Sequence, residues 1–313
     1  MLQLTPLALL AVLVGLHLHF EEDPAPSSAP PPIEKEVLAL FDYDAEAELE
    51  IEEHDWTQEH RYTRADLSYA SPEGGRVPAY LFQPEGEGPY AGIVMMHGMP
   101  GSRDNALRMA PRYVETGAVV IAISAPWARP DGPREDILRF DARDRDEQVQ
   151  LIQDLRRAVD FLLALDTVDP ERLAYVGGSY GGAMGGLLAG VETRLVAYAL
   201  AVGDGGLVAH FTGAEDPPPE EQGVGAEKFK KWVELMQPIE PIRFVAHAAP
   251  AHLLFQNGRT DQLVPAADAE AYQAAASEPK TILWYDDGHA LTPERIEDQM
   301  RWLSERIGIT APD

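Results

Sequence analysis

The distribution of apolar residues along the chain changes in three stages. A ten-residue apolar run at 7–16 is followed by a stretch rich in Pro, Ser and Ala, and then by an acidic segment that ends near residue 60. Beyond that point, short unbroken apolar runs alternate with longer segments that are apolar only at helical spacing. Unbroken short runs are typical of strands buried on both faces, and helical spacing is typical of amphipathic helices.

The region after residue 60 predicts an α/β domain. Its first two strands, 61–70 and 77–82, are separated by SPEGGR, whose Pro and Gly predict the turn of an antiparallel hairpin. Helices are expected over about 105–116 and 145–165. Further strands are expected at 91–96, 118–124, 172–176, 195–202, 251–256 and 281–285. Apolar strands that alternate with helices predict a mostly parallel, doubly wound sheet covered on both faces.

The N-terminal segments predict targeting rather than a core. The apolar run within residues 1–20 fits a secretory signal better than a membrane span, which needs about 20 apolar residues. We therefore expect a signal-like or anchoring segment, and a secreted, periplasmic or membrane-tethered protein, with a cytoplasmic protein as the alternative. Residues 21–60 are expected to form an acidic, Pro-rich linker and flank with one short helix, before a domain over 61–309.

Charge and composition exclude several classes of protein. The 52 Asp and Glu against 25 Lys and Arg give a net charge of −27, which disfavours binding to nucleic acid. Residues 1–60 hold 14 carboxylates and a single base, Lys35, so −13 of this charge lies in the N-terminal fifth. The absence of cysteine excludes disulfides, Cys-ligated metals and a thiol nucleophile. No H-E-x-x-H cluster is present, and neither a metal nor a cofactor is expected.

The strongest chemical signal is the sequence GGSYGG at 177–182. It follows the predicted strand 172–176 and precedes a helix-compatible segment. A G-x-S-x-G motif in this context predicts a sharp strand-to-helix turn that exposes a nucleophilic serine, because bulkier neighbours would clash with the strand and the helix. Ser179 is the candidate nucleophile. A glycine-rich helix start without chemistry is the alternative.

A nucleophilic serine needs a base and an acid that orients it. Asp261 lies 82 residues downstream, in the loop after the strand 251–256, and His289 follows 28 residues later, after the last strand. Their order and loop positions predict His289 as the general base and Asp261 as its partner. Asp204, at the end of the strand 195–202, is the alternative acid.

The remaining histidines and acids near these motifs have simpler explanations. His210, His247 and His252 are expected to be packed or solvated. Asp286 and Asp287 are too close to His289 in sequence to reach the far side of its ring, and are expected to shape its loop.

The sequence HGMPG at 97–101, directly after a predicted strand, is the candidate oxyanion loop. Acyl transfer develops negative charge on the carbonyl oxygen, so two backbone N–H groups must point at it. The N–H groups of Met99 and Tyr180 are the expected pair. His97 is expected to brace the loop, with direct catalysis as the alternative.

Substrate contacts are expected from loops over the strand ends. Trp127 lies in a loop that leaves the strand 118–124 and is a candidate pocket residue, because this loop is expected to wall the acyl pocket. Residues 204–246 are longer than a crossover needs and predict a small cap. Phe211, Trp232 and Met236 are candidate pocket residues, with packing of the cap onto the body as the alternative.

Four motifs in order, HGMPG, GGSYGG, GRTDQLVP and DGH, make residues 62–307 resemble the α/β-hydrolase superfamily. Within it, the chain is similar to the dienelactone-hydrolase-like and prolyl-oligopeptidase-like serine esterases. The resemblance implies an α/β-hydrolase fold and hydrolysis of carboxylic esters through an acyl-enzyme without a cofactor. True dienelactone hydrolases use a cysteine, which is absent here. Prolyl oligopeptidases normally carry a β-propeller, which the roughly 60 residues before the core could not build.

These observations predict a serine carboxylesterase that acts on a small-molecule ester. A peptidase, an amidase or a thioesterase would use the same residues. A non-catalytic surface scaffold, with the acidic N-terminal segment as its working part, is the remaining alternative. The sequence leaves the acyl chain length and the oligomeric state open.

Overall fold

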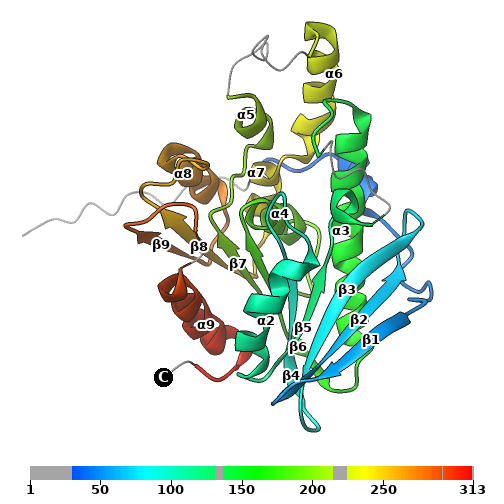
Figure 1. Cartoon of the computed structure of the whole chain (residues 1–313). Coiled ribbons are helices and arrows are strands. Elements are labelled where there is room, and N and C mark those ends of the chain that lie inside the picture. The colour runs from blue at the N-terminus through cyan, green and yellow to red at the C-terminus, as the bar shows by residue number, and fades with distance from the viewer. Residues whose placement is uncertain (1–29, 131–136, 214–223, 291, 312–313) are drawn as a thin grey trace, which may run out of the picture. The chain divides into compact units, whose positions relative to one another are not determined.

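The computed structural model describes residues 30–130, 137–213, 224–290 and 292–311 (Figure 1). By internal contacts the chain divides into Met1–Pro31 and Pro32–Asp313, and the second unit carries the fold described below. The expected signal-like segment 1–20 lies outside the described residues, so export remains a prediction. Among the helices of the described residues, none is long and apolar enough to cross a membrane.

A single mixed sheet forms the centre of the second unit. Its strands are β1 (Glu52–Gln58), β2 (Tyr62–Ala70), β3 (Arg76–Pro84), β4 (Tyr90–Met96), β5 (Ala118–Ile123), β6 (Val168–Gly178), β7 (Ala197–Ala201), β8 (His252–Gly258) and β9 (Lys280–Tyr285). They lie in the order β1-β2-β3-β5-β4-β6-β7-β8-β9. The first three strands and the β3–β5 pair are antiparallel, and every pair from β5 to β9 is parallel.

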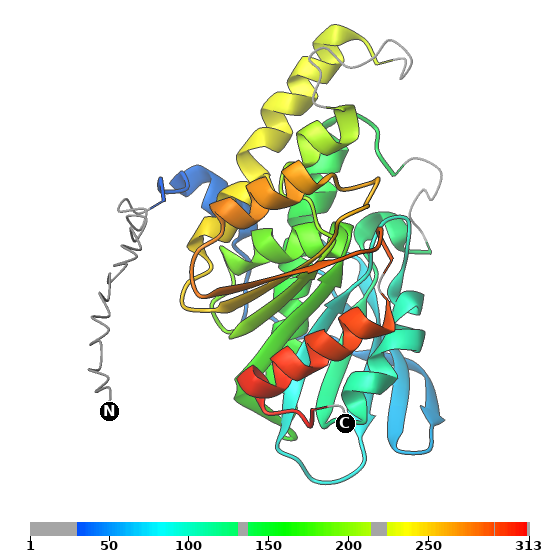
Figure 2. The same ribbon diagram turned by 90° about the vertical axis from the view of Figure 1, so that its left-hand side faces the viewer.

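Helices cover both faces of this sheet. They are α1 (Lys35–Leu38), α2 (Ala106–Val114), α3 (Ala142–Leu163), α4 (Tyr180–Ala189), α5 (Leu207–Thr212), α6 (Ala226–Met236), α7 (Pro241–Phe244), α8 (Ala266–Ala275) and α9 (Pro293–Ile307), with short 3-10 turns η1 (Ala39–Phe41), η2 (Arg103–Asn105), η3 (Pro126–Ala128), η5 (Gln237–Ile239) and η6 (Val245–His247). Helices α2 and α9 lie side by side on one face (Figures 1 and 2). The larger core cluster, on the other face, includes residues of α3, α4, α7 and α8.

The predicted alternation of strands and helices is confirmed. The hairpin forms with Ala70 opposite Arg76, and α3 buries the apolar stripe expected of it. The structure differs at β1, which the sequence did not predict. All but one of its residues are exposed, so neither face shows the alternating apolar pattern by which strands are recognised.

The N-terminal flank belongs to the compact unit, which begins at Pro32 and not at the expected boundary of 61. Phe41 is 1% exposed, and its ring meets Phe244 edge to face at 5.5 Å. The Gln153 side chain donates to the Leu40 carbonyl at 3.0 Å. The acidic composition of this segment predicts a solvated flank. Its few apolar residues show too little periodicity to indicate that they are buried.

The register brings the functional loops together. Met96 is paired with Gly177, Gly178 with Ala201, and Ala201 with Gln256. Neighbouring parallel strands therefore end at one edge of the sheet. The loops that follow β4, β6, β7, β8 and β9 all leave from this edge, which is where α/β sheets form their sites.

Docking of the flank can be measured by replacing Phe41 with alanine. Removing this buried ring is expected to lower the free energy of unfolding by about 3–5 kcal/mol. Trp56→Ala is the matched control, because Trp56 is 58% exposed on β1, and its effect is expected to stay within about 0.5 kcal/mol. Urea denaturation gives both values. Equal, small losses would show that the flank is not docked.

Candidate active site

Ser179 stands alone between β6 and α4. Its φ of 56° and ψ of −121° place it in a region that non-glycine residues rarely occupy. Such a conformation costs of order 1–3 kcal/mol and needs support from its surroundings. The support is close packing: a Cβ on Gly181 would lie 2.5 Å from the Met96 carbonyl oxygen. Only glycine fits at that position, which is the reason predicted from the motif.

His289 and Asp261 meet Ser179 in one hydrogen-bonded chain. His289 Nε2 lies 2.8 Å from Ser179 Oγ, and His289 Nδ1 lies 2.8 Å from Asp261 Oδ2. A carboxylate can only accept, so Nδ1 carries the ring proton and Nε2 presents its lone pair to the serine hydroxyl. The structure therefore brings the three predicted residues together from the loops after β6, β8 and β9.

Backbone hydrogen bonds fix the Asp261 carboxylate independently of His289. Its Oδ1 accepts the backbone N–H groups of Leu263 at 2.9 Å and Val264 at 3.0 Å, which leaves Oδ2 for His289. The side chain is almost fully buried. Asp204, the alternative acid, does not contact His289 and is hydrogen-bonded to His210 instead.

Arg295 positions the His289 loop, a role that no sequence motif indicated. Its guanidinium pairs with the Asp287 carboxylate and donates to the Gly288 carbonyl at 2.9 Å, directly before the histidine. Arg295 is 0% exposed and lies over the Tyr285 ring at 4.9 Å. Asp287 thus shapes the loop as predicted. Thr292 and Pro293 could have indicated the helix start, but not that Arg295 turns inward.

His97 braces the candidate oxyanion loop. Its Nδ1 donates to the Gly98 carbonyl at 2.8 Å, and its Nε2 accepts the Ala125 N–H at 3.1 Å. Both bonds require a neutral ring. Burial lowers the pKa of His97 to about 4, which keeps the ring neutral near pH 7. The predicted bracing role fits these contacts.

The braced loop lies directly against Ser179. A Cβ on Gly98 would be 3.1 Å from the Ser179 Cβ, so this glycine permits the close approach. Met99 and Tyr180, whose N–H groups are the predicted oxyanion donors, line the same cavity as Ser179.

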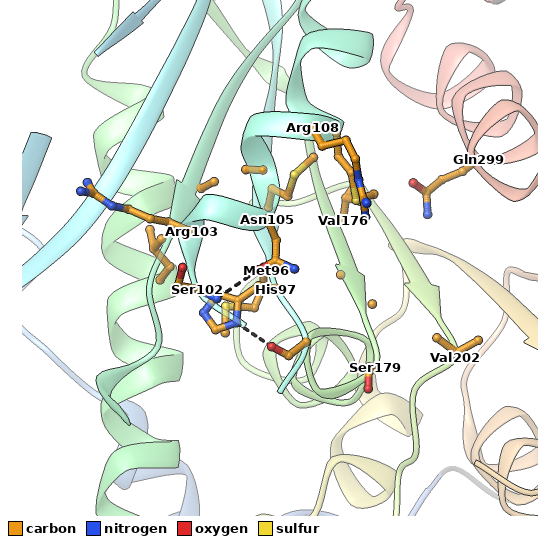
Figure 3. Close-up of a pocket in the computed structure, with 18 of the residues that line it drawn as sticks. Met96, His97, Ser102, Arg103, Asn105, Arg108, Val176, Ser179, Val202 and Gln299 are labelled. Carbon is orange, nitrogen blue, oxygen red and sulfur yellow. Dashed lines mark hydrogen bonds between the residues drawn. The ribbon is translucent and has the colours of Figure 1, made fainter. Parts of the chain in front are cut away.

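Two cavities of about 210 Å³ each meet at Ser179. The first also contains His289 and extends between the sheet, α2 and α9. Figure 3 shows its polar wall, with Asn105 from η2, Arg108 from α2 and Gln299 from α9, while Arg103 turns away toward its ion pair with Asp66. The second cavity does not include His289. It is lined by Met99, Ser179, Tyr180, Ala183, Asp204, Leu207, His210, Phe211, Leu263 and Val264.

The predicted pocket residues have different positions in the structure. Phe211 lines the second cavity, as predicted. Trp127 lines neither; it is buried between the rings of His97 and Tyr180, at centroid distances of 5.3 and 6.0 Å. Its side chain lines a third cavity, together with Ser102 and Asn105, which also line the first.

The prediction for Trp232 is wrong, and the packing alternative holds. Its side chain is 0% exposed, donates from Nε1 to Asp144 at 2.8 Å and stacks on Phe229. These contacts attach α6 to α3. Met236, on the same helix, is buried as well. The apolar face of α6 is buried within the domain, so it is not available to contact a substrate.

In the part of the chain that the structure describes, no group of three or more His, Cys, Asp or Glu side chains could hold a metal ion.

The fold and the serine elbow define an α/β-hydrolase, and comparison with solved structures agrees. Acetyl xylan esterase from Paenibacillus sp. R4 superposes with a TM-score of 0.72 at 19% identity, covering 89% of this chain and 97% of that one. Acetyl xylan esterase 1 from Thermoanaerobacterium sp. JW/SL YS485 gives 0.68 at 19%, covering 89% and 95%. S-formylglutathione hydrolase from Agrobacterium tumefaciens gives 0.63 at 14%, covering 82% and 99%. At these identities the likeness shows the fold.

The family follows from the sequence itself. Residues 140–308, more than half of the chain, match the sequence model of the prolyl oligopeptidase family, so this protein belongs to that family. Comparison with curated protein sequences finds no match. The predicted α/β-hydrolase fold and the resemblance to the prolyl-oligopeptidase-like serine hydrolases are confirmed.

The neutral state of His97 gives a pH-dependent contribution to stability. Its pKa of about 4 in the folded protein lies below the 6.5 of a free histidine, so between these values only the unfolded chain binds the proton. Stability from this group is full above about pH 6.5 and falls with the pH until about pH 4. By linkage, wild type should lose about 2 kcal/mol relative to His97→Gln between about pH 7 and about pH 5. Urea denaturation across this range measures it, and parallel curves would contradict it.

Arg295 is expected to control the reactivity of Ser179 through the His289 loop. Arg295→Met should slow the labelling of Ser179 by a fluorophosphonate at least about tenfold, since a misplaced base loses most of a general-base effect. Arg301→Met, on the exposed face of the same helix, is the matched control. Thermal unfolding of each variant checks that the comparison is made on folded protein. Equal labelling rates in Arg295→Met and Arg301→Met would show that Arg295 does not control the reactivity of Ser179.

Proposed function

We propose that this protein is a serine carboxylesterase that hydrolyses carboxylic esters through an acyl-enzyme. The observation that carries the proposal is the hydrogen-bonded chain from Ser179 Oγ through His289 to Asp261. Nucleophile, base and orienting acid each have the atoms that their roles need, with both distances at 2.8 Å.

Each step uses groups already in place. Ser179 Oγ attacks the ester carbonyl carbon and passes its proton to His289 Nε2, while Asp261 stabilises the resulting imidazolium. The N–H groups of Met99 and Tyr180 hold the oxyanion of the tetrahedral intermediate. On collapse, His289 gives the proton to the leaving alcohol. A water molecule then attacks the acyl-enzyme by the same route and regenerates Ser179.

The two cavities divide the substrate between them. His289 must protonate the leaving oxygen, so the alcohol part lies beside its Nε2, in the cavity that contains His289. Asn105 and Arg108 at that cavity suit an alcohol with further polar groups. The acyl part then occupies the second cavity, which is lined mainly by apolar side chains.

Ester hydrolysis is favoured over peptide hydrolysis by the extent of the structural likeness. The two acetyl xylan esterases match over 89% of this chain. The family match supports a peptidase as the second candidate, with the same residues in the same roles. A thioesterase would also use them.

Labelling and kinetics test the proposal together. A fluorophosphonate is expected to modify Ser179, located by peptide mass spectrometry, and p-nitrophenyl esters of increasing chain length are expected to be hydrolysed. Ser179→Ala should lower kcat at least about a thousandfold, as nucleophile removal does in serine hydrolases. Ser304→Ala, on the exposed side of α9, is the control. A folded protein that is neither labelled nor active on esters would overturn the proposal, and turnover of a prolyl nitroanilide alone would favour the peptidase.

A further inference from the structure

A second imidazole–carboxylate pair faces the acyl cavity. His210 Nδ1 lies 3.0 Å from Asp204 Oδ2, and both residues line the cavity that contains Ser179. Asp204 follows the carboxyl end of β7, and His210 lies on α5. The sequence suggested only that Asp204 might replace Asp261 and that His210 was packed or solvated. In the structure the two residues are hydrogen-bonded to each other.

Further contacts fix both members of this pair. Asp204 is 5% exposed, and its Oδ1 accepts the Gly206 N–H at 2.8 Å, which leaves Oδ2 for the histidine. His210 packs edge to face on Phe211, with centroids 5.2 Å apart. Helix α5 is itself held by Glu240, whose Oε1 accepts the Val208 N–H at 2.7 Å. The imidazole is therefore fixed in direction.

Among the residues that the structure describes, one atom of this pair has no hydrogen-bond partner. The carboxylate takes the Nδ1 proton, so His210 Nε2 carries a lone pair, and it has no hydrogen-bond partner among the described residues. The side chain is 27% exposed at the cavity. The other wall residues near it, Leu207, Leu263 and Val264, are apolar. A fixed acceptor in an apolar wall selects a ligand that brings one hydrogen-bond donor.

The surrounding charge disfavours an acidic ligand. Glu240 and Asp268 lie near Asp204, and burial together with the Asp204 charge raises the pKa of each carboxyl. A carboxylate on the acyl group would meet this negative field, whereas a neutral hydroxyl would not. A hydroxyl can also accept a hydrogen bond, so it suits the ring in its protonated form as well.

We propose that Asp204 and His210 form a specificity site that selects acyl groups bearing a hydroxyl. The inference rests on the proposed esterase function and on the placement of the acyl group in the cavity away from His289. His210 Nε2 accepts the substrate hydroxyl, Asp204 fixes the tautomer that can accept it, and the apolar residues contact the carbon chain. The substrate class is a carboxylic ester of a short hydroxy acid.

Matched esters test this selectivity. The substrates are p-nitrophenyl butyrate, its 2-hydroxy and 3-hydroxy derivatives, and the corresponding methoxy derivatives, which accept but cannot donate. Wild type is expected to prefer at least one hydroxy ester over both its plain and its methoxy counterparts in kcat/KM. His210→Phe, which removes the acceptor but keeps a ring, should lower the hydroxy-to-plain ratio about fivefold to tenfold, the effect of one hydrogen bond.

Two further variants separate a positioning role from a structural one. Asp204→Asn can donate to Nδ1 and so place the proton on Nε2, and it should abolish the preference for hydroxy over methoxy esters. His210→Gln, which retains an acceptor, should keep part of the hydroxy-to-plain ratio, and provides the test if His210→Phe does not fold. His252→Gln, far from the cavity at the start of β8, should leave every ratio unchanged.

The possible outcomes separate this inference from the proposed function. Hydrolysis of the esters with no hydroxy preference, or with a ratio that His210→Phe leaves unchanged, overturns the specificity site and leaves the esterase standing. Absence of any Ser179-dependent ester hydrolysis overturns both. A preference that falls in His210→Phe and changes from hydroxy-selective to unselective in Asp204→Asn supports the site as described.

Discussion

The turn at Ser179 constrains the rest of the molecule. A serine with a positive φ needs support, and besides the close packing around it, backbone hydrogen bonds hold both sides: its own N–H donates to the Ala201 carbonyl at 2.9 Å, and its carbonyl accepts from Ala183 at 3.0 Å. The Val202 N–H continues the series to the Gln256 carbonyl at 2.8 Å. The ends of β6, β7 and β8 are thereby tied into one rigid edge. Every loop that carries chemistry starts from that edge.

Buried polar side chains then turn these loops into a site. Arg295 holds the residues before His289, and His97 joins the loops after β4 and β5. Each is a buried polar group, and losing one of its hydrogen-bond partners would cost free energy. Each therefore restricts the position of the loop that it contacts. The same dependence makes the site sensitive to substitutions that do not touch Ser179.

Two imidazole–carboxylate pairs of nearly the same geometry serve different purposes. In both, the carboxylate accepts the Nδ1 proton and is itself fixed by the backbone, Asp261 by two N–H groups and Asp204 by one. They differ in what Nε2 meets. His289 Nε2 lies beside the Ser179 hydroxyl, whereas His210 Nε2 faces the open cavity. The roles proposed for the two histidines therefore differ because their Nε2 atoms face different surroundings, although the pairs are alike.

The sequence by itself determined the architecture and indicated the class of enzyme. Apolar runs fixed most of the strands, and the glycines around Ser179, with Asp261 and His289 in the right loops, indicated the hydrolase, because local steric demands and strand order are written in neighbouring residues. The tertiary structure decided the rest. The placement of Trp232 against α3, the inward turn of Arg295 and the pairing of Asp204 with His210 depend on contacts between segments distant in the chain or on the direction in which a side chain points. The edge strand β1 was missed because its exposed residues need no apolar pattern. Spacing along a sequence records which loops share an edge of the sheet, but only packing decides which side chains meet there.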